Sequence, residues 1–321
     1  MISILSEENY DAVMAGTVEP ALKKIREDVS LLLTAGGTLH AEVYEQLNAV
    51  RAVVILHGYT ESAEKFREMT WYFLRAGFNV YAVDHRGHGQ SVREVADTSI
   101  THVEHFEDYL RDLEDFMAQI VLPRTGNLPR TLYAHSMGGA IGAFALMQHP
   151  DWFERAVLTA PMIAASTFPL PRCAGLAIAE HMVRKGKGSK RAFVGKPFNP
   201  DDEKFESACS TSRARFDYYL QKRITHPLLQ NCSPSYAWVQ EALKVTPKLL
   251  SSDNCSKIIT PLLLCQATRD KVVCLPEQEQ FVRQIPCAKL ERFDAKHEIY
   301  MSGNEVMGKY VPAVISFLMG T

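Results

Sequence analysis

The segment TLYAHSMGGA, residues 131–140, carries the strongest structural signal in this sequence. A mostly apolar run typical of a buried strand leads directly into Ser136, and small residues typical of a helix start follow it. A serine at such a sharp strand-to-helix turn presents its hydroxyl group, and the residues two before and two after it must be small. Ala134 and Gly138 occupy those positions, and we interpret Ala134, which replaces the usual glycine, as a tolerated difference of one methyl group. Ser136 is therefore the candidate nucleophile.

Two later segments supply a candidate acid and a candidate base. Residues 261–268, PLLLCQAT, predict a short buried strand, and Asp270 stands just beyond its end. Residues 288–293, AKLERF, predict another strand, and His297 lies in the loop that follows. Nucleophile, acid and base thus occur in the chain order Ser, Asp, His, each after a strand, as one known triad arrangement requires. The sequence predicts that Ser136, Asp270 and His297 meet in space.

Other polar residues compete for these roles. Asp294 lies closer to His297 in the chain, but it sits on the same loop, where we interpret it as shaping the turn. Four further histidines stand at strand ends near the expected site: His57, His85, His88 and His135. Their proximity to the site does not by itself make them catalytic. Strand alternation turns His135 away from the side of the nucleophile. We interpret His57 and His135 as packed, hydrogen-bonded imidazoles.

Two backbone N–H groups are candidates for stabilising a negative oxygen. Met137 follows the nucleophile at the start of a helix, where unpaired amides and the helix dipole favour negative charge. Residues 52–56, AVVIL, predict a strand covered on both faces, and the loop after it places the Tyr59 N–H as the second donor. The Tyr59 side chain would then border an acyl pocket. The alternative is a plain strand-to-helix connection.

Five motifs carry a resemblance to a known family: HGYTES (57–62), DHRGHGQS (84–91), HSMGG (135–139), TRD (268–270) and KHE (296–298). Over roughly residues 38–318 the chain resembles the α/β-hydrolase branch that holds bacterial lysophospholipases and monoacylglycerol lipases, a hydrolase domain of the serine aminopeptidase S33 type. The resemblance implies an α/β-hydrolase fold, with a mostly parallel sheet flanked by helices and an inserted helical cap.

The resemblance also implies an activity. It indicates a serine hydrolase that cleaves the carboxylic ester of a single-chain acyl lipid through an acyl-enzyme, with an acyl ester or lysolipid as its small-molecule partner. Ser136, Asp270 and His297 would be catalytic, and the Tyr59 and Met137 N–H groups would form the oxyanion hole. These groups require no cofactor, and the sequence shows no spacing of zinc ligands.

Strands and helices alternate along most of the chain, which favours a mostly parallel sheet. We expect strands at about 39–44, 52–57, 79–84, 131–135 and 155–160, helices at 62–76 and 102–121, and a helical lead-in at 7–29 interrupted at Pro20. The alternation breaks between about 162 and 257, where prolines punctuate the entry and strand-like apolar runs are missing. We therefore expect residues 1–161 and 258–321 to form the core and residues 162–257 to form the cap.

A cap above the carboxyl ends of the strands would cover the substrate site. We single out Phe168, Tyr236 and Trp238 in the cap, together with Tyr59, as candidate substrate-binding residues. Further cap residues that would line an acyl tunnel, or simply hold the cap together, are Leu170, Leu176, Ile178, Met182, Phe216, Tyr218 and Tyr219.

Composition restricts the partners and the compartment. A net charge of −2 provides no field for nucleic acid, so we expect no such partner. Seven cysteines without a C-x-x-C pair favour free thiols in a reducing compartment. The N-terminus lacks the pattern of a signal peptide and no apolar run is long enough to span a bilayer, so we expect a cytoplasmic protein. The sequence leaves the oligomeric state open.

One cluster of basic residues in the predicted cap leaves peripheral contact with membrane lipid open. It comprises Arg184, Lys185, Lys187, Lys190, Arg191 and Lys196, around three glycines. Such a cluster attracts an anionic lipid surface or a head-group phosphate, or is simply a solvated loop.

Three alternative functions remain at this stage. A proline iminopeptidase-like peptidase would use acidic cap residues to hold a free amine, for which Asp201, Asp202, Glu203 and Glu206 are available. A small-ester carboxylesterase would differ only in pocket length. A binding protein on the same scaffold would have lost catalysis, although the three triad residues argue against it.

Overall fold

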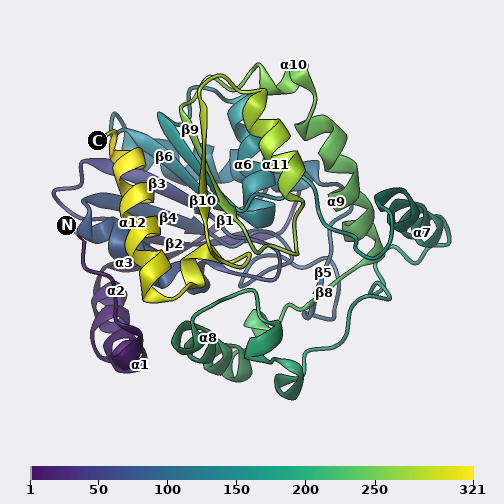
Figure 1. Ribbon diagram of the computed structural model, residues 1–321, viewed down its shortest axis with the longest axis horizontal. Coiled ribbons are helices and arrows are strands. Elements are labelled where there is room, and N and C mark those ends of the chain that lie inside the picture. Colours follow the sequence, from purple (N-terminus) through teal and green to yellow (C-terminus); the bar gives the residue numbers. More distant parts are fainter. Residues whose placement is uncertain (1) are drawn as a thin grey trace.

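The computed structural model describes residues 2–321, and within them eight strands form one twisted central sheet (Figure 1). Along the sheet the order is β1, β2, β4, β3, β6, β7, β9, β10. β2 runs antiparallel to its neighbours β1 and β4, and every other pairing is parallel. The strands are β1 (Arg26–Leu32), β2 (Thr38–Tyr44), β3 (Arg51–Leu56), β4 (Phe78–Val83), β6 (Arg130–His135), β7 (Arg155–Thr159), β9 (Leu262–Ala267) and β10 (Ala288–Phe293).

Helices cover both faces of this sheet, which is why its inner strands are apolar on both sides. β4 and β9 are buried at every residue. One face packs against α1 (Tyr10–Val13), α2 (Glu19–Ile25), α3 (Arg67–Arg75) and α12 (Asn304–Met319). The other packs against α4 (Glu107–Phe116), α6 (Ser136–Gln148), α9 (Tyr236–Leu249) and α11 (Leu275–Arg283).

Strand order brings the candidate site together. β6 leads into Ser136, β9 leads toward Asp270, and β10 leads toward His297. These strands lie in the same half of the sheet and run parallel, so their carboxyl ends meet at one edge. That edge is where open α/β sheets place their ligand sites.

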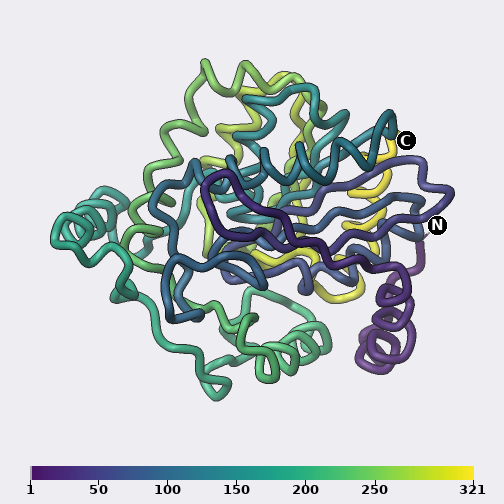
Figure 2. The backbone as a smooth tube through the Cα atoms, turned by 180° about the vertical axis from the view of Figure 1, so that it is seen from behind, coloured from purple at the N-terminus to yellow at the C-terminus, as the bar shows by residue number. Residues whose placement is uncertain are grey.

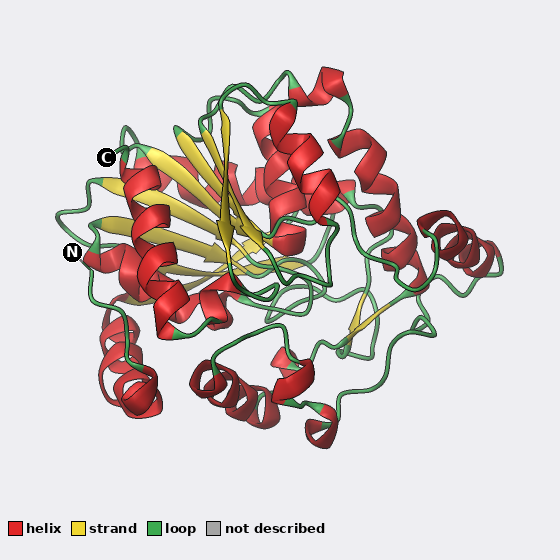
Figure 3. Ribbon diagram, in the orientation of Figure 1, coloured by secondary structure: helices red, strands yellow, loops and turns green. Residues whose placement is uncertain are grey.

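The segment between β7 and β9 is mainly helical. It contains α7 (Arg172–Arg184), α8 (Arg213–Thr225), α9 and α10 (Ser252–Cys255), and one short strand, β8 (Ser233–Pro234), which pairs with β5 (Ile100–Thr101). Figure 3 shows α7 and α8 beyond the arrowheads of the central strands, apart from the helical layers that cover the sheet. This arrangement sets both helices over the edge where the candidate site lies.

The N-terminal segment differs from the expectation of a helix at 7–29 interrupted at Pro20. The helical backbone continues past Pro20 to the end of α2, because a wide π-turn (Met14–Val18) comes before it and Pro20 stands at an N-terminal position of α2, where its missing N–H is tolerated. Residues from Arg26 onward form the edge strand β1 instead, which lies in front of the other strands when the molecule is seen from behind (Figure 2).

The predicted helix at 102–121 also has different ends. α4 begins at Glu107, and a second π-turn (Met117–Val121) joins it to α5 (Leu122–Thr125), whose Pro123 again follows the wide turn. None of the helices within residues 2–321 is both long enough and apolar enough to cross a bilayer.

Candidate active site

Ser136 sits on a strained turn between β6 and α6. Its φ angle is +51°, in the left-handed region that non-glycine residues rarely adopt. Gly138 makes this turn possible, since a Cβ atom there would lie 2.4 Å from the carbonyl oxygen of Leu56 and 2.5 Å from that of His57. The start of α6 therefore packs directly on the end of β3.

The alanine at position 134 is accommodated by a glycine further along α6. A Cβ atom added to Gly142 would lie 3.3 Å from the Cβ of Ala134 and 2.9 Å from Cδ2 of Leu132. Because Gly142 has no side chain, α6 approaches β6 closely even though β6 carries a methyl group at this point. The structure thus gives a physical reason why the glycine of the usual pattern is dispensable here.

The structure brings Ser136, His297 and Asp270 into one chain of hydrogen bonds. Nε2 of His297 lies 2.8 Å from Oγ of Ser136, and Nδ1 lies 2.6 Å from Oδ2 of Asp270. A carboxylate only accepts, so Nδ1 carries the proton and Nε2 faces the serine hydroxyl as the acceptor. This is the arrangement in which an imidazole can remove the proton of a serine.

The surroundings of Asp270 favour its ionised form. Burial by itself would raise the pKa of the carboxyl group, but the hydrogen bond and charge of His297 outweigh it, with help from the backbone N–H groups of Val272 and Val273. Those amides donate to Oδ1 over 2.7 and 3.2 Å. Together these contacts hold the pKa of Asp270 below its usual value.

The competing carboxylate, Asp294, points elsewhere. Its side chain is 81% exposed and forms an ion pair with Arg269 over 2.9 Å. It contributes to the loop before His297, while the deeper carboxylate of Asp270 faces the imidazole.

The loop from His57 to Thr60 lies against the nucleophile. A Cβ atom at Gly58 would lie 3.0 Å from the Cβ of Ser136, and the Gly58 N–H donates to Oε2 of Glu61 over 2.6 Å. Thr60 has a φ angle of +62°, and its N–H donates to Nε2 of His88 over 3.2 Å. Within residues 2–321 the N–H of Tyr59, between these two, donates to no acceptor.

The second predicted donor, Met137, lies in the first turn of α6. Amides in the first turn of a helix have no carbonyl partner four residues earlier within the helix, so the Met137 N–H is free of the helical ladder. Met137 and Tyr59 therefore lie on two different elements, α6 and the loop after β3, next to the nucleophile.

The neighbouring histidines support the loops around the site. Nδ1 of His57 lies 2.7 Å from the Gly58 carbonyl oxygen, and its Nε2 accepts the His85 N–H over 2.9 Å. Nδ1 of His135 donates to the Thr159 carbonyl oxygen over 3.1 Å. Burial lowers the pKa of His57, and it lowers that of His135 to about 3. Both rings are thus neutral and packed, and neither contacts the hydroxyl of Ser136.

Comparison with known proteins identifies the family of this chain. Residues 48–301 match the family described as serine aminopeptidase, S33. The chain belongs to this family.

Among relatives of this S33 family member, lysophospholipase L2 of Escherichia coli K12 is 34% identical over 231 residues, which cover 70% of this chain. The match spans 64% of that relative, slightly less than two thirds of its length. The probable lysophospholipase L2 of Haemophilus influenzae is 25% identical over 286 residues, covering 84% of this chain and 85% of the relative.

Solved structures confirm the α/β-hydrolase fold expected from the sequence. A soluble variant of monoglyceride lipase from Saccharomyces cerevisiae, in complex with a substrate analog, superposes with a TM-score of 0.71. The match covers 92% of this chain and 96% of the yeast chain at 17% identity, so the likeness concerns the fold alone.

This S33 family member also holds a buried ionic cluster beside the site, which the sequence did not reveal. Nζ of Lys65 lies 2.9 Å from Oε1 of Glu61 and 2.6 Å from Oε1 of Glu298. Tyr300 donates its hydroxyl to the same oxygen of Glu61. The side chains of Lys65 and Glu61 are only 7% and 4% exposed. Only the four-residue spacing of Glu61 and Lys65 hints at their contact, and nothing in the sequence links them to Glu298.

The cluster holds opposite charges in place. Burial would lower the pKa of Lys65, but the carboxylates of Glu298 and Glu61 raise it well above its usual value. Burial would raise the pKa of Glu61, but the charge of Lys65 and the hydrogen bonds from Tyr300 and Lys65 hold it far below its usual value. Lys65 and Glu61 therefore keep their charges at neutral pH.

An apolar cavity of about 320 Å³ lies between α7 and α9. Three of the predicted substrate-binding residues, Phe168, Tyr236 and Trp238, line it. The fourth, Tyr59, is not part of the lining, but its ring packs on Trp238 with 4.3 Å between the ring centroids. The cavity therefore extends toward the loop that carries the predicted oxyanion donor.

The α8 aromatics do not join this apolar cavity. Phe216 and Tyr219 line a separate, polar cavity of about 280 Å³, beside Thr60, Lys65 and Glu298. Since Thr60 follows Tyr59 and Glu298 follows His297 in the chain, the polar cavity lies beside the site. The expectation that cap aromatics line one common tunnel is wrong for α8, because that helix packs away from α7 and α9.

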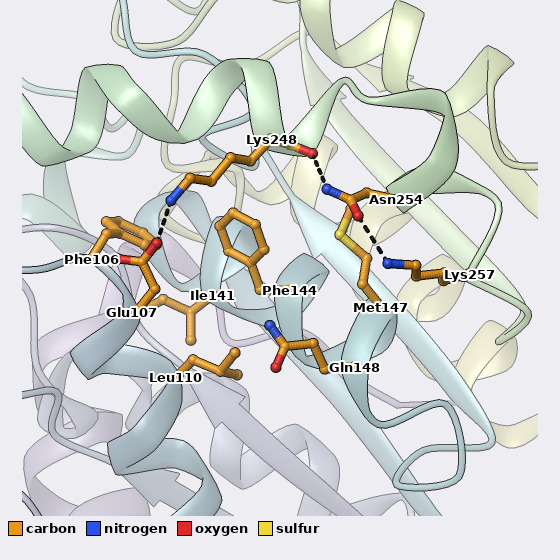
Figure 4. Close-up of a pocket in the computed structure, with 10 residues that line it drawn as sticks. All are labelled: Phe106, Glu107, Leu110, Ile141, Phe144, Met147, Gln148, Lys248, Asn254 and Lys257. Carbon is orange, nitrogen blue, oxygen red and sulfur yellow. Dashed lines mark hydrogen bonds and ion pairs between the residues drawn. The ribbon is translucent and has the colours of Figure 1, made fainter.

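A further cavity of about 290 Å³ lies where α4, α6 and α9 meet (Figure 4). Phe106, Leu110, Ile141 and Phe144 form its apolar part, and Lys248 pairs with Glu107 at its rim. No predicted site residue is among the ten that line it.

Proposed function

We propose that this protein hydrolyses the carboxylic ester of a single-chain acyl lipid, as a lysophospholipase or monoacylglycerol lipase does, through an acyl-enzyme. The observation that carries the proposal is the unbroken chain from Ser136 Oγ through His297 to Asp270, with contacts of 2.8 and 2.6 Å. The names of the relatives, which include lysophospholipase L2, support the choice of substrate class.

The geometry supports a two-step mechanism. His297 takes the proton of Ser136 through Nε2 as the serine oxygen attacks the ester carbonyl, and Asp270 stabilises the imidazolium that forms. The Tyr59 and Met137 N–H groups receive the negative carbonyl oxygen. His297 then protonates the leaving alcohol and activates the water that releases the fatty acid. These groups carry every step, so the reaction as proposed uses no cofactor.

We assign the two ends of the substrate to the two cavities beside the site. The apolar cavity of about 320 Å³ between α7 and α9 suits the acyl chain, with Phe168, Tyr236 and Trp238 as its contacts. The polar cavity beside Thr60 and Lys65 suits the head group. Since the helices between β7 and β9 line both cavities, we treat residues 162–257 as a cap on a core formed by residues 1–161 and 258–321.

We favour an ester over an aminoacyl amide. Of the acidic residues that would hold a free amine, Glu203 pairs with Arg223 over 2.9 Å, while Asp201, Asp202 and Glu206 are exposed. An apolar cavity of about 320 Å³ suits an acyl chain better than the charged amine of an amino acid.

We propose a reducing compartment for this protein. In the part of the chain that the structure describes, all seven cysteines are free, which supports a reducing compartment such as the cytoplasm.

A substrate panel tests the proposal. The purified protein and its Ser136→Ala variant are assayed with lysophosphatidylcholine, lysophosphatidylethanolamine, monoacylglycerol, p-nitrophenyl esters of increasing chain length and an aminoacyl amide. We expect turnover of lipid esters, a preference for long acyl chains, and labelling by a fluorophosphonate probe that Ser136→Ala abolishes. Turnover confined to short esters would indicate a carboxylesterase, and turnover confined to the amide would indicate a peptidase. Activity retained by Ser136→Ala would refute the nucleophile.

A further inference from the structure

We propose that this protein docks on an anionic lipid bilayer through the outer side of α7 and the loop after it, so that the membrane faces the mouth of the apolar cavity. We call this surface, residues 168–196, the α7 face. The proposal rests on the proposed function, because it gives a single-chain lipid a route from the bilayer to the site. Figures 1 and 2 show α7 at the periphery of the molecule, away from the sheet.

Exposed apolar side chains gather on the α7 face. Phe168 is 91% exposed, Val194 65% and Phe193 61%, and Leu170 and Ile178 are also exposed. All five line the apolar cavity between α7 and α9. Single exposed apolar residues are common on protein surfaces, but a group around one apolar cavity marks a contact surface. These side chains therefore belong both to the cavity wall and to the outer surface.

The same surface carries an excess of positive charge. Residues 168–196 contain seven cationic side chains and a single carboxylate, although the whole chain has a net charge of −2. Arg172 pairs with Glu277 over 2.8 Å and Arg191 pairs with Asp97 over 2.6 Å, so these two are held by the protein itself. The exposed Lys185, Lys187, Lys190 and Lys196 take part in none of the ion pairs found within residues 2–321.

This combination of groups matches a bilayer better than it matches another macromolecule. Lysine on a polar rim, beside aromatic and aliphatic side chains, is the pattern of surface segments that lie at the boundary between head groups and acyl chains. Unpaired lysines add attraction to anionic lipid, and they lose little hydration because they remain at the head-group level. The exposed apolar groups are few and form a rim around an opening, so they suit insertion among acyl chains.

The position of the cavity explains how docking would serve the site. Its lining runs from Phe168 and Phe193 on the α7 face to Trp238 on α9. Trp238 packs on Tyr59, whose N–H is the predicted oxyanion donor beside Ser136. An acyl chain that enters between the exposed side chains would therefore reach the site without crossing bulk water.

Vesicle binding tests the α7 face directly. The full chain with Ser136→Ala, which cannot consume lipid, is mixed with vesicles of phosphatidylglycerol and phosphatidylcholine in equal parts, or of phosphatidylcholine alone, and bound protein is measured by flotation. The charge variant is Lys185→Gln, Lys187→Gln, Lys190→Gln and Lys196→Gln together. The matched control replaces four exposed lysines elsewhere, Lys23, Lys24, Lys257 and Lys289, with Gln.

We expect binding to the anionic vesicles that the control variant retains and the charge variant loses. Each lysine near an anionic surface strengthens binding about fivefold, so the charge variant should bind at least about 100-fold more weakly. A separate apolar variant, Phe193→Ser with Val194→Ser, should also weaken binding, and circular dichroism verifies that each variant is folded. Equal binding by the charge and control variants, or equal binding to neutral and anionic vesicles, would overturn the proposal. An absence of vesicle binding would also overturn it, and the α7 face would then suit an acidic protein partner.

Activity separates this proposal from the proposed function. When the four Lys→Gln changes are made in the chain that keeps Ser136, the variant should hydrolyse a water-soluble p-nitrophenyl ester at the parental rate. It should lose turnover only of substrate presented in anionic vesicles. Failure of the parent to hydrolyse any ester would contradict the proposed function while leaving vesicle binding measurable. If the parent hydrolyses esters but does not bind vesicles, only the proposed membrane docking of the α7 face is contradicted.

Discussion

Nζ of Lys65 lies 2.6 Å from Oε1 of Glu298, the residue directly after His297. The same ammonium group contacts Glu61, and Glu61 holds the Gly58 N–H through its other oxygen. A single buried cation therefore connects the loop that carries the predicted oxyanion donor to the loop that carries the predicted base. Neither loop can shift by much without breaking this cluster.

The first prediction concerns Glu61 as a positioning residue. Glu61→Gln removes the charge that holds Lys65 and weakens the acceptor for the Gly58 N–H, so the Tyr59 N–H should lose its alignment. Loss of a whole oxyanion donor reduces kcat by about 100- to 1000-fold, so misalignment of one donor should cost about 10- to 100-fold. Steady-state kinetics with a soluble ester should show this loss in kcat, with KM little changed. Glu64→Gln is the control: Glu64 lies three residues after Glu61, its carboxylate pairs with Arg67 and Lys222, and the variant should keep the parental kcat. An unchanged kcat in Glu61→Gln would show that the cluster does not align the loop.

The second prediction concerns the stability of the same cluster. Lys65→Met leaves the carboxylates of Glu61 and Glu298 buried without their cation, and removal of one partner from a buried ion pair costs about 3–5 kcal/mol. Urea unfolding should show a fall of this size in the free energy of unfolding. Adding Glu61→Gln and Glu298→Gln removes the unpaired charges and should recover part of the loss. If the triple variant is as unstable as Lys65→Met alone, packing rather than charge explains the effect.

The sequence predicted the parts of the fold that depend on local patterns. The sequence predicts a strand at residues 288–293, and β10 has the same bounds. The prediction is accurate here because a clear loop follows the last apolar residue of the strand. The three strand ends that carry Ser136, Asp270 and His297 were also predicted, since parallel strands of one sheet share an edge for their carboxyl ends. The roles of these residues remain predictions.

The sequence could not predict contacts that depend on how distant segments pack. β1 was missed because as an edge strand it is largely exposed and shows no clean alternation of apolar and polar residues. Lys65 and Glu298 are far apart in the chain, so only the packed structure shows that they meet. The same holds for Tyr219, an aromatic residue that looks suited to an acyl tunnel but lines the polar cavity, because α8 packs near Lys65.

The third prediction concerns acid sensitivity. The pKa of His135 is about 3 in the folded protein because the ring is buried, against a usual value of about 6.5. The unfolded chain therefore binds a proton here as the pH falls below about 6.5, while the folded protein does not, so the free energy of unfolding decreases toward acid. For His135 alone the decrease between pH 7 and pH 5 is about 2 kcal/mol. The buried His57, His85 and His88, whose pKa values burial also lowers, act in the same direction.

Urea unfolding at pH 7 and pH 5 measures this effect. His135→Gln keeps a donor for the Thr159 carbonyl oxygen but does not titrate, so it should lose less stability than the parent between the two pH values. The buried carboxylates Asp84 and Asp270 contribute little in this range, because their pKa values lie below the usual range in the folded protein and the unfolded carboxyls are mostly ionised at pH 5. A variant whose pH dependence parallels that of the parent would mean that His135 is not neutral in the folded protein.

The fourth prediction concerns the packing that allows Ala134 before the nucleophile. Gly142→Ala would place a methyl group 3.3 Å from the Cβ of Ala134 and 2.9 Å from Cδ2 of Leu132, so one of the two must move. Better helix propensity of alanine offsets part of this strain, by about 1 kcal/mol, so the single variant does not isolate the contact. Combining Gly142→Ala with Ala134→Gly does isolate the contact between positions 134 and 142, because helix propensity and the contact with Leu132 are the same in both backgrounds and cancel. In a double-mutant cycle we therefore expect Gly142→Ala to be more favourable by about 0.5–1 kcal/mol in the Ala134→Gly background than in the parent. Additive free energies of unfolding would show that β6 and α6 do not compete for this space, and the presence of alanine before Ser136 would then need another physical reason.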